Sequence, residues 1–139
     1  MTLSPFHLAL PVNDLAKAKI FYCNVLGGIV AREDEKWLDI NFFGHQVSLH
    51  LKPEALDNID TNKVDGENIP VRHFGIVMAW DTWHELTNKL NKDGINFIIE
   101  PTIRFAGKVG EQATCFIQDP AGNCLEFKSF KDPSQLFAT

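Results

Sequence analysis

The order of apolar and polar positions divides the chain into two similar halves. In the first half, the strand-like stretch FHLALPV precedes a run from Leu15 to Leu26 in which apolar residues recur at helical spacing. Asp14 is placed to cap this helix, and Gly27 is placed to end it. Three more strand-like stretches follow: GIVAR, KWLDINFF and HQVSLHL. The predicted order is therefore strand, helix and three strands.

The same order returns in the second half. VRHFGIVMA predicts a strand, and a helix capped by Asp81 and ended by Gly94 follows it. INFIIE, ATCFIQ and NCLEFKSF predict three more strands, and DPAGN between the last two suits a tight turn. The segment between the halves is polar and punctuated by Pro and Gly, which is typical of a linker. We therefore predict an α+β fold with one domain over 1–139, made of βαβββ modules at 4–52 and 71–130, a linker at 53–70 and a C-terminal tail at 131–139.

Composition narrows the possible partners. The 139 residues include 13 Lys and Arg against 18 Asp and Glu, a net charge of −5, which disfavours nucleic acid or an anionic membrane as partner. No apolar run approaches the roughly 20 residues that a membrane helix needs. Cys23, Cys115 and Cys124 form no paired spacing, and the N-terminus has no signal-peptide pattern. We expect a cytoplasmic protein that acts on a small molecule.

Short matching segments support an internal repeat. Phe6-His7-Leu8-Ala9 resembles Arg72-His73-Phe74-Gly75, and Leu49-His50-Leu51-Lys52 occupies a place like that of Leu125-Glu126-Phe127-Lys128. This alignment matches His7 with His73 and His50 with Glu126. We expect the two copies to share one core.

The alternation of strand side chains places four titratable groups together. In each of four strands a bulky apolar row opposes a small or polar row, and the polar rows carry His7, His50, His73 and Glu126. A single strand histidine is usually a hydrogen-bonded structural residue, and a single glutamate is usually solvated. Two imidazoles and a carboxylate together, however, are a favoured set for divalent transition metals. The pattern predicts a metal site with His7, His73 and Glu126 as ligands, and His50 either as a fourth ligand or near it.

Two longer motifs carry a resemblance to a known family. FHLALPVNDLAKAKIFYCNVLG near the start and DPAGNCLEFKSF near the end resemble the vicinal oxygen chelate superfamily, which is also called the glyoxalase/bleomycin-resistance/extradiol-dioxygenase superfamily. FFGHQ, RFAGKVGEQAT and LEFK are most similar to short proteins described as predicted extradiol-type dioxygenases. The resemblance implies that the two βαβββ modules form a curved mixed-sheet barrel around a divalent metal. It also implies that His7, His73 and Glu126 bind that metal.

The resemblance also implies an activity. We expect a metal-dependent dioxygenase that acts on a small substrate with neighbouring oxygens, such as a catechol, with Fe(II) as the metal and Mn(II), Ni(II) or Zn(II) as alternatives. The alternative functions are a glyoxalase-like lyase or isomerase and a non-catalytic binding protein of the resistance type. The candidate catalytic residues are His50, Arg104, which could hold an anionic group together with Lys108, and His45, a candidate proton shuttle.

Aromatic residues near strand ends and in the tail bear on the oligomeric state. Phe42, Phe43, Phe130 and Phe137 are expected to add exposed aromatic area. Large apolar patches often mark protein interfaces, and members of the resembled family often pair. We therefore expect a homodimer, with a monomer as the alternative.

Overall fold

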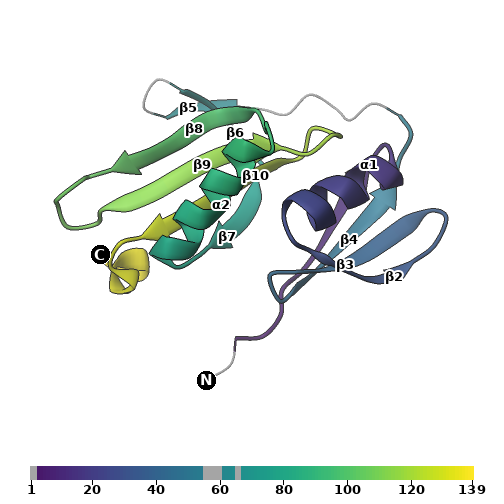
Figure 1. Cartoon of the computed structure of the whole chain (residues 1–139), viewed down its shortest axis with the longest axis horizontal. Coiled ribbons are helices and arrows are strands. Elements are labelled where there is room, and N and C mark those ends of the chain that lie inside the picture. The colour runs from purple at the N-terminus through teal and green to yellow at the C-terminus, as the bar shows by residue number, and fades with distance from the viewer. Residues whose placement is uncertain (1–2, 55–60, 65–66) are drawn as a thin grey trace. The chain divides into compact units, whose positions relative to one another are not determined.

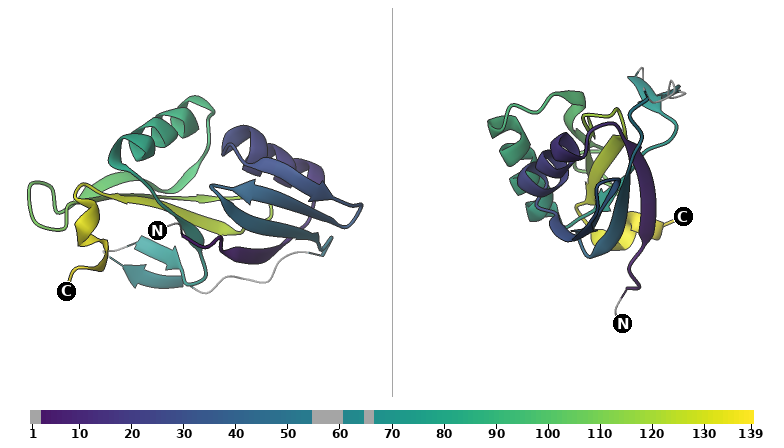
Figure 2. Two further views of the ribbon diagram at one scale, coloured as in Figure 1. Left: turned by 90° about the horizontal axis from the view of Figure 1, so that it is seen from below. Right: turned by 90° about the vertical axis from the view of Figure 1, so that its right-hand side faces the viewer.

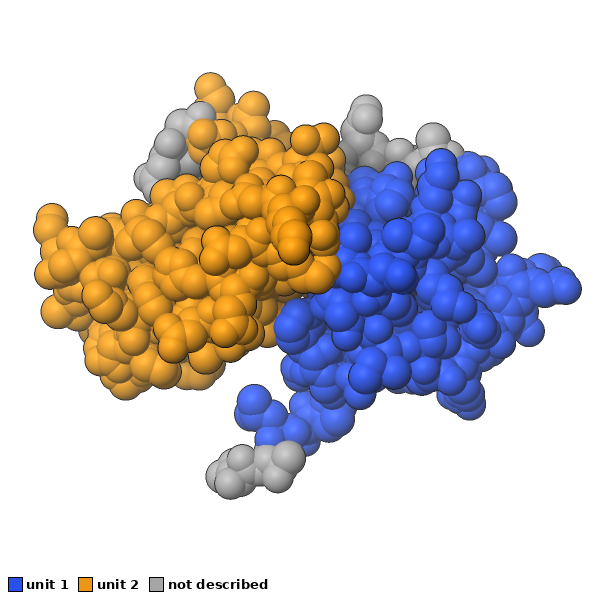
Figure 3. All heavy atoms as spheres, viewed as in Figure 1, with its two compact units in different colours: residues 1–58, 119–123 blue, residues 59–118, 124–139 orange. Residues whose placement is uncertain are grey.

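The computed structural model describes residues 3–54, 61–64 and 67–139 (Figure 1). The chain divides into two compact units, which Figure 3 colours blue and orange. Unit 1 consists of residues 1–58 and 119–123, and unit 2 of residues 59–118 and 124–139. No helix in the described part of the chain is both long and apolar enough to cross a membrane.

Unit 1 has the predicted order of strand, helix and three strands. Its elements are β1 (His7–Val12), α1 (Leu15–Lys19), a π-helical continuation (Ile20–Val25), β2 (Ile29–Glu33), β3 (Trp37–Phe42) and β4 (His45–Leu51). The sheet order is β1-β4-β3-β2, with β1 parallel to β4 and the other pairs antiparallel. The Asp14 side chain accepts a hydrogen bond from the amide of Lys17, which confirms the predicted cap. Gly27, with φ of 80°, follows the last helical turn as predicted.

Unit 2 repeats this order. Its main elements are β7 (Phe74–Val77), α2 (Trp80–Lys92), β8 (Phe97–Arg104), β9 (Gln112–Gln118) and β10 (Cys124–Phe130), followed by a 3₁₀ turn (Pro133–Phe137). The sheet order is β7-β10-β9-β8, with β7 parallel to β10. The predicted cap of α2 was wrong, because Ala79 holds that position and Asp81 lies in the first helical turn. A carboxylate there still interacts favourably with the helix dipole.

Part of the predicted linker is regular structure. β5 (Thr61–Val64) and β6 (Glu67–Pro70) pair as a two-stranded antiparallel sheet within unit 2. Residues 55–60 and 65–66 of that linker lie outside the described residues. Figure 2 shows α2 over one face of the unit 2 sheet and the β5–β6 hairpin near the other. Ile69 of β6 packs with Ile99 and Phe116 of the larger sheet, so the hairpin covers the face that Phe116 occupies.

Each unit has its own buried side chains. In unit 1, Tyr22 and Phe42 are fully buried, and their rings pack edge to face. The predicted exposure of Phe42 was therefore wrong, whereas Phe43 and Phe137 are exposed. In unit 2, Trp83 of α2 is buried against β10, and its indole Nε1 donates to the carbonyl of Phe127 at 2.9 Å. The described strands form separate open sheets, and none of these sheets closes into a barrel.

The predicted turn between β9 and β10 is organised by Asp119, which belongs to unit 1. Asp119 Oδ1 accepts hydrogen bonds from the amides of Ala121 and Asn123, as in a tight Asx-type turn. Its Oδ2 accepts from the Tyr22 hydroxyl and the Asn123 side chain, both at 2.8 Å. These four hydrogen bonds explain how a carboxylate with 4% of its surface exposed is stabilised without a cation.

Candidate metal centre

A histidine and a glutamate on neighbouring strands of unit 2 form the strongest candidate for a metal centre. Glu126 lies in β10 opposite Gly75 of the parallel strand β7, and His73 immediately precedes β7. His73 Nε2 lies 3.5 Å from Glu126 Oε1. The two side chains are thus near enough to share one cation.

Hydrogen bonding determines which nitrogen of His73 faces Glu126. The other nitrogen, Nδ1, is 2.7 Å from the carbonyl oxygen of Pro70 at the end of β6. A carbonyl oxygen only accepts, so Nδ1 carries the hydrogen and Nε2 of the neutral ring presents a lone pair. The ring also lies edge-on to Phe116, with ring centroids 5.1 Å apart. An imidazole held through its second nitrogen in this way is typical of metal-binding histidines.

Glu126 is oriented by a hydroxyl group. Thr114 Oγ1 of β9 donates to Glu126 Oε2 at 2.6 Å, which leaves Oε1 directed at His73. An imidazole lone pair and a carboxylate oxygen repel each other unless a proton or a metal cation lies between them. Nitrogen and oxygen ligands of one metal, with bonds of about 2.1 Å at a tetrahedral angle, lie about 3.4 Å apart. The chemistry and spacing of this pair therefore fit a divalent metal.

The third predicted ligand, His7, belongs to unit 1. His7 is the first residue of β1 and pairs in register with Gln46 of β4. Its Nδ1 is 2.8 Å from Gln46 Oε1. Within residues 3–54, 61–64 and 67–139, no three His, Cys, Asp or Glu side chains gather as a metal site. The structure therefore pairs His73 with Glu126 within unit 2.

Strand register corrects the predicted match between the two halves. Glu126 lies opposite Gly75, which is two residues after His73. In unit 1, the residue two positions after His7 is Ala9, and Ala9 lies opposite Ser48. Ser48, rather than His50, is thus the counterpart of Glu126. His50 is exposed and pairs with Pro11, four residues along β1 from His7, which is roughly 13 Å at about 3.3 Å per residue.

The other candidate catalytic residues occupy separate places. His45 Nδ1 accepts a hydrogen bond of 2.8 Å from the amide of Phe6, so it fixes the chain just before β1. Arg104 ends β8 opposite Gln112, whereas Glu126 lies opposite Phe116. Those two positions on β9 are four residues apart, which places Arg104 roughly 13 Å along the sheet from Glu126 at about 3.3 Å per residue.

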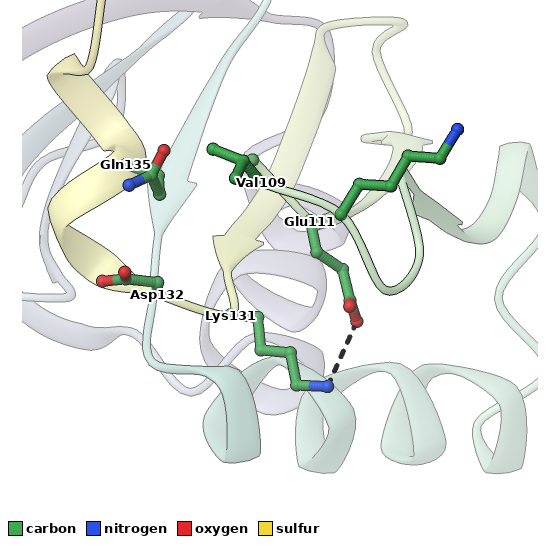
Figure 4. Close-up of a pocket in the computed structure, with 7 residues that line it drawn as sticks. Val109, Glu111, Lys131, Asp132 and Gln135 are labelled. Carbon is green, nitrogen blue, oxygen red and sulfur yellow. Dashed lines mark ion pairs between the residues drawn. The ribbon is translucent and has the colours of Figure 1, made fainter.

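Lys108 lines a shallow surface pocket of about 260 Å³ beyond the β8–β9 hairpin. In Figure 4 the side chains of Glu111 and Lys131 point toward one another, and their ion-pair distance is 3.5 Å. Glu111 also accepts from the amide of Gly107 at 2.7 Å, so it holds the loop in shape. Two lysines, Lys108 and Lys131, and two carboxylates, Glu111 and Asp132, line this pocket, and Arg104 is not among its lining residues.

Burial disfavours the thiolate form of two of the cysteines. Burial raises the pKa of the Cys115 thiol to about 12, so Cys115 stays protonated at neutral pH. Burial also raises the pKa of Cys23. Cys124 is buried, and Gln118 Nε2 donates to its sulfur at 3.4 Å. Its surroundings agree with a small filling residue.

Sequence reasoning missed the groups that orient the candidate ligands. Thr114 belongs to the predicted strand ATCFIQ, and the period of two along it would have put Thr114 on the face of Phe116. The carbonyl of Pro70 carries no sequence signal, because every residue has one. The contact of Gln46 with His7 depends on the register of β1 with β4, and its contact with Asp39 depends on the register of β3 with β4.

Comparisons with known proteins agree with this fold. The family model of the Glyoxalase/Bleomycin resistance protein/Dioxygenase superfamily matches residues 4–127. A solved structure described as a glyoxalase/bleomycin resistance protein/dioxygenase from Alicyclobacillus acidocaldarius is 32% identical, with a TM-score of 0.79 and 96% of each chain covered. No curated protein matches the sequence.

Two more distant structures are similar in fold alone. A fosfomycin resistance protein from Listeria monocytogenes has 16% identity and a TM-score of 0.68, covering 93% of this chain and 94% of its own. A lactoylglutathione lyase from Agrobacterium tumefaciens has 18% identity and a TM-score of 0.65, covering 98% of this chain and 97% of its own.

Proposed function

Because the chain belongs to the Glyoxalase/Bleomycin resistance protein/Dioxygenase superfamily, we propose that it is a divalent-metal-dependent enzyme acting on a small molecule with neighbouring oxygens. The observation that carries this proposal is the His73–Glu126 pair, in which an imidazole nitrogen and a carboxylate oxygen face each other at 3.5 Å. Within the superfamily we propose a dioxygenase with a catechol-like substrate. We also propose that the two βαβββ modules form the expected barrel around this metal.

His73 Nε2 and Glu126 Oε1 are the proposed ligands from unit 2, and the resemblance adds His7 as the third. Two histidines and one carboxylate leave open positions and suit Fe(II), with Mn(II), Ni(II) or Zn(II) as alternatives. The bound metal would supply Lewis acidity toward two neighbouring substrate oxygens. Pro70 and Thr114 support this role, since their hydrogen bonds hold the two donor atoms toward each other before any ligand binds.

We also propose roles for the other candidate residues. His50 is exposed and pairs about 13 Å along β1 from His7, so we propose it as an acid–base group rather than as a further ligand of the same metal. His45 accepts from the Phe6 amide through Nδ1, so only its Nε2 is available to transfer a proton. Arg104 suits an anionic substituent of the substrate, because a guanidinium group binds a carboxylate through two hydrogen bonds.

Anaerobic loading with Fe(II), followed by oxygen uptake with a panel of catechols, tests the proposed reaction. A dioxygenase puts both atoms of O₂ into the product, so uptake should match substrate consumed, and ring-cleaved product should appear. The absence of uptake by fully loaded protein across the panel would contradict the dioxygenase proposal. Turnover of a thiol–aldehyde adduct with Ni(II) or Zn(II) would instead identify a lyase or isomerase. Ligand binding without turnover would identify a binding protein.

A further inference from the structure

We propose that Asp39 and Gln46 are positioning residues that select the tautomer of His7 and thereby leave its Nε2 free to bind a cation. This inference rests on the proposed function for the role of His7 as a ligand. Neither residue is proposed to touch the substrate, and both lie in unit 1 with His7. They act through a chain of hydrogen bonds across three neighbouring strands.

The hydrogen bonds link a residue of β3 to one of β4 and then to one of β1. Gln46 Nε2 donates to Asp39 Oδ2 at 3.5 Å, and Gln46 Oε1 lies 2.8 Å from His7 Nδ1. Gln46 pairs in register with His7, and Asp39 pairs with Ser48, two residues further along β4. All three side chains therefore lie on one face of the unit 1 sheet, where strand alternation brings them together.

The carboxylate of Asp39 determines which groups donate and which accept along this series of hydrogen bonds. An ionised carboxylate only accepts, so the amide of Gln46 must turn its NH₂ group toward Asp39 and its oxygen toward His7. The amide oxygen is also an acceptor, so the hydrogen between it and the imidazole must reside on His7 Nδ1. Nε2 of the neutral ring then has a free lone pair, which is the form that a metal ligand requires.

Asp39 is held in place for this role. It has 7% of its surface exposed, and Ser48 Oγ donates to its Oδ1 at 2.5 Å. The Arg32 guanidinium group lies 3.8 Å from Oδ2, the same oxygen that accepts from Gln46. The hydroxyl donates to one carboxylate oxygen and the guanidinium group lies beside the other, so the surroundings of Asp39 supply donors to it.

Different acceptor groups fix the same tautomer of His7 in unit 1 and of His73 in unit 2. In unit 2 the backbone carbonyl of Pro70 fixes the hydrogen on Nδ1 of His73. In unit 1 a side-chain amide, itself oriented by a carboxylate, does so for His7. His45 has the opposite arrangement, because its Nδ1 accepts from the Phe6 amide and the hydrogen must lie on Nε2. The two candidate ligands thus share the tautomer with a free Nε2, whereas His45, which is not a proposed ligand, has the other tautomer.

Long-range ¹H–¹⁵N correlation spectra of the full-length metal-free protein test the tautomers directly. They should be recorded well above the ordinary imidazole pKa of about 6.5, where the rings are neutral. We expect the Nδ1–H form at His7 and His73 and the Nε2–H form at His45, which serves as an internal reference. The Nε2–H form at His7 in the unmodified protein would overturn the proposal.

Two substitutions test whether Gln46 and Asp39 determine the tautomer of His7. Gln46→Leu removes the acceptor and should convert His7 mainly to the Nε2–H form, without changing His73 or His45. Asp39→Asn removes the strict requirement for this orientation, because an amide can donate as well as accept, so the share of the Nδ1–H form at His7 should fall. Glu33→Gln is the control, since Glu33 lies in the same unit, forms its ion pair with Lys19 and does not belong to these hydrogen bonds, and it should leave His7 unchanged. An unchanged His7 in Gln46→Leu would contradict the proposal even if the buried Asp39→Asn variant failed to fold.

Metal titration by calorimetry separates this inference from the proposed function. Gln46→Leu should weaken the affinity for a divalent metal about 10- to 100-fold, as is typical for loss of a group that orients a ligand. Undiminished affinity in Gln46→Leu would overturn the positioning role. If the unmodified protein bound no metal while its His7 still showed the Nδ1–H form, the proposed function would fail and the hydrogen-bond chain would stand.

Discussion

Glu126 divides its two oxygens between two partners, and we expect this division to favour binding of a cation by the His73–Glu126 pair. Oε2 accepts from Thr114, while Oε1 faces the lone pair of His73 Nε2. A carboxylate with one satisfied oxygen keeps a fixed orientation, and its second oxygen remains available. The arrangement is thus prepared for a cation by groups that do not themselves bind it.

The hydroxyl of Thr114 should therefore matter for affinity more than for folding. Thr114→Val keeps the shape of the side chain but removes the hydrogen bond to Glu126. We expect the affinity for a divalent metal to fall at least about 10-fold, measured by competition with a chelating dye. Thr102→Val is the matched control, because the Thr102 hydroxyl bonds to a carbonyl of its own strand. Equal affinities of the two variants would exclude this role of Thr114.

At the scale of elements, the close approach of β7 to β10 places His73 beside Glu126. Gly75 lies opposite Glu126 in this parallel pair, and a Cβ atom added there would overlap the backbone carbonyl of Glu126. The absence of a side chain at position 75 is thus what allows the strands to pair at this point.

Gly75→Ala should damage both the fold of unit 2 and the metal centre. We expect a loss of about 1–3 kcal/mol in the free energy of unfolding, because the overlap is with backbone and not with a flexible side chain. Chemical denaturation measures this loss, and metal titration of the folded fraction should show weaker binding. Val77→Ala, at an exposed position of the same strand, should change neither quantity by a comparable amount. A Gly75→Ala variant as stable as the unmodified protein would refute the steric argument.

The sequence predicted the faces of the strands but not the register between them or the β5–β6 hairpin. Strand alternation was enough to put His73 and Glu126 on one face, because Glu126 lies in β10 and His73 directly precedes β7, so the period of two can be extended to it. Glu126 is equivalent to Ser48 and not to His50. This equivalence follows from the strand registers of β1 with β4 and of β7 with β10, which a local sequence pattern does not determine. The β5–β6 hairpin was missed because its residues are mostly polar, and polar stretches with Pro and Gly are typical of linkers.

At the scale of the whole molecule, several large apolar side chains of unit 2 lie at the surface. Val109 and Phe137 have 87% and 88% of their surface exposed, and Phe105 has 56%. Such exposure favours association with another protein surface.

We predict a homodimer on this basis and from the family resemblance. Light scattering at micromolar concentration should give twice the chain mass of 15.7 kDa. Phe137→Ser, which removes the most exposed aromatic side chain, should shift the population toward the monomer, whereas Leu3→Ser at the other terminus serves as control. A mass of 15.7 kDa for the unmodified protein would exclude the dimer.

Glu126 is the proposed carboxylate ligand of a divalent metal, and the metal content of the protein after dialysis measures whether it binds one. The unmodified protein should retain a stoichiometric amount of metal, and Glu126→Ala should retain almost none. The fold should persist in Glu126→Ala, since the buried apolar residues of both units are unchanged, and circular dichroism can verify this. Stoichiometric metal in a folded Glu126→Ala variant would contradict the claim.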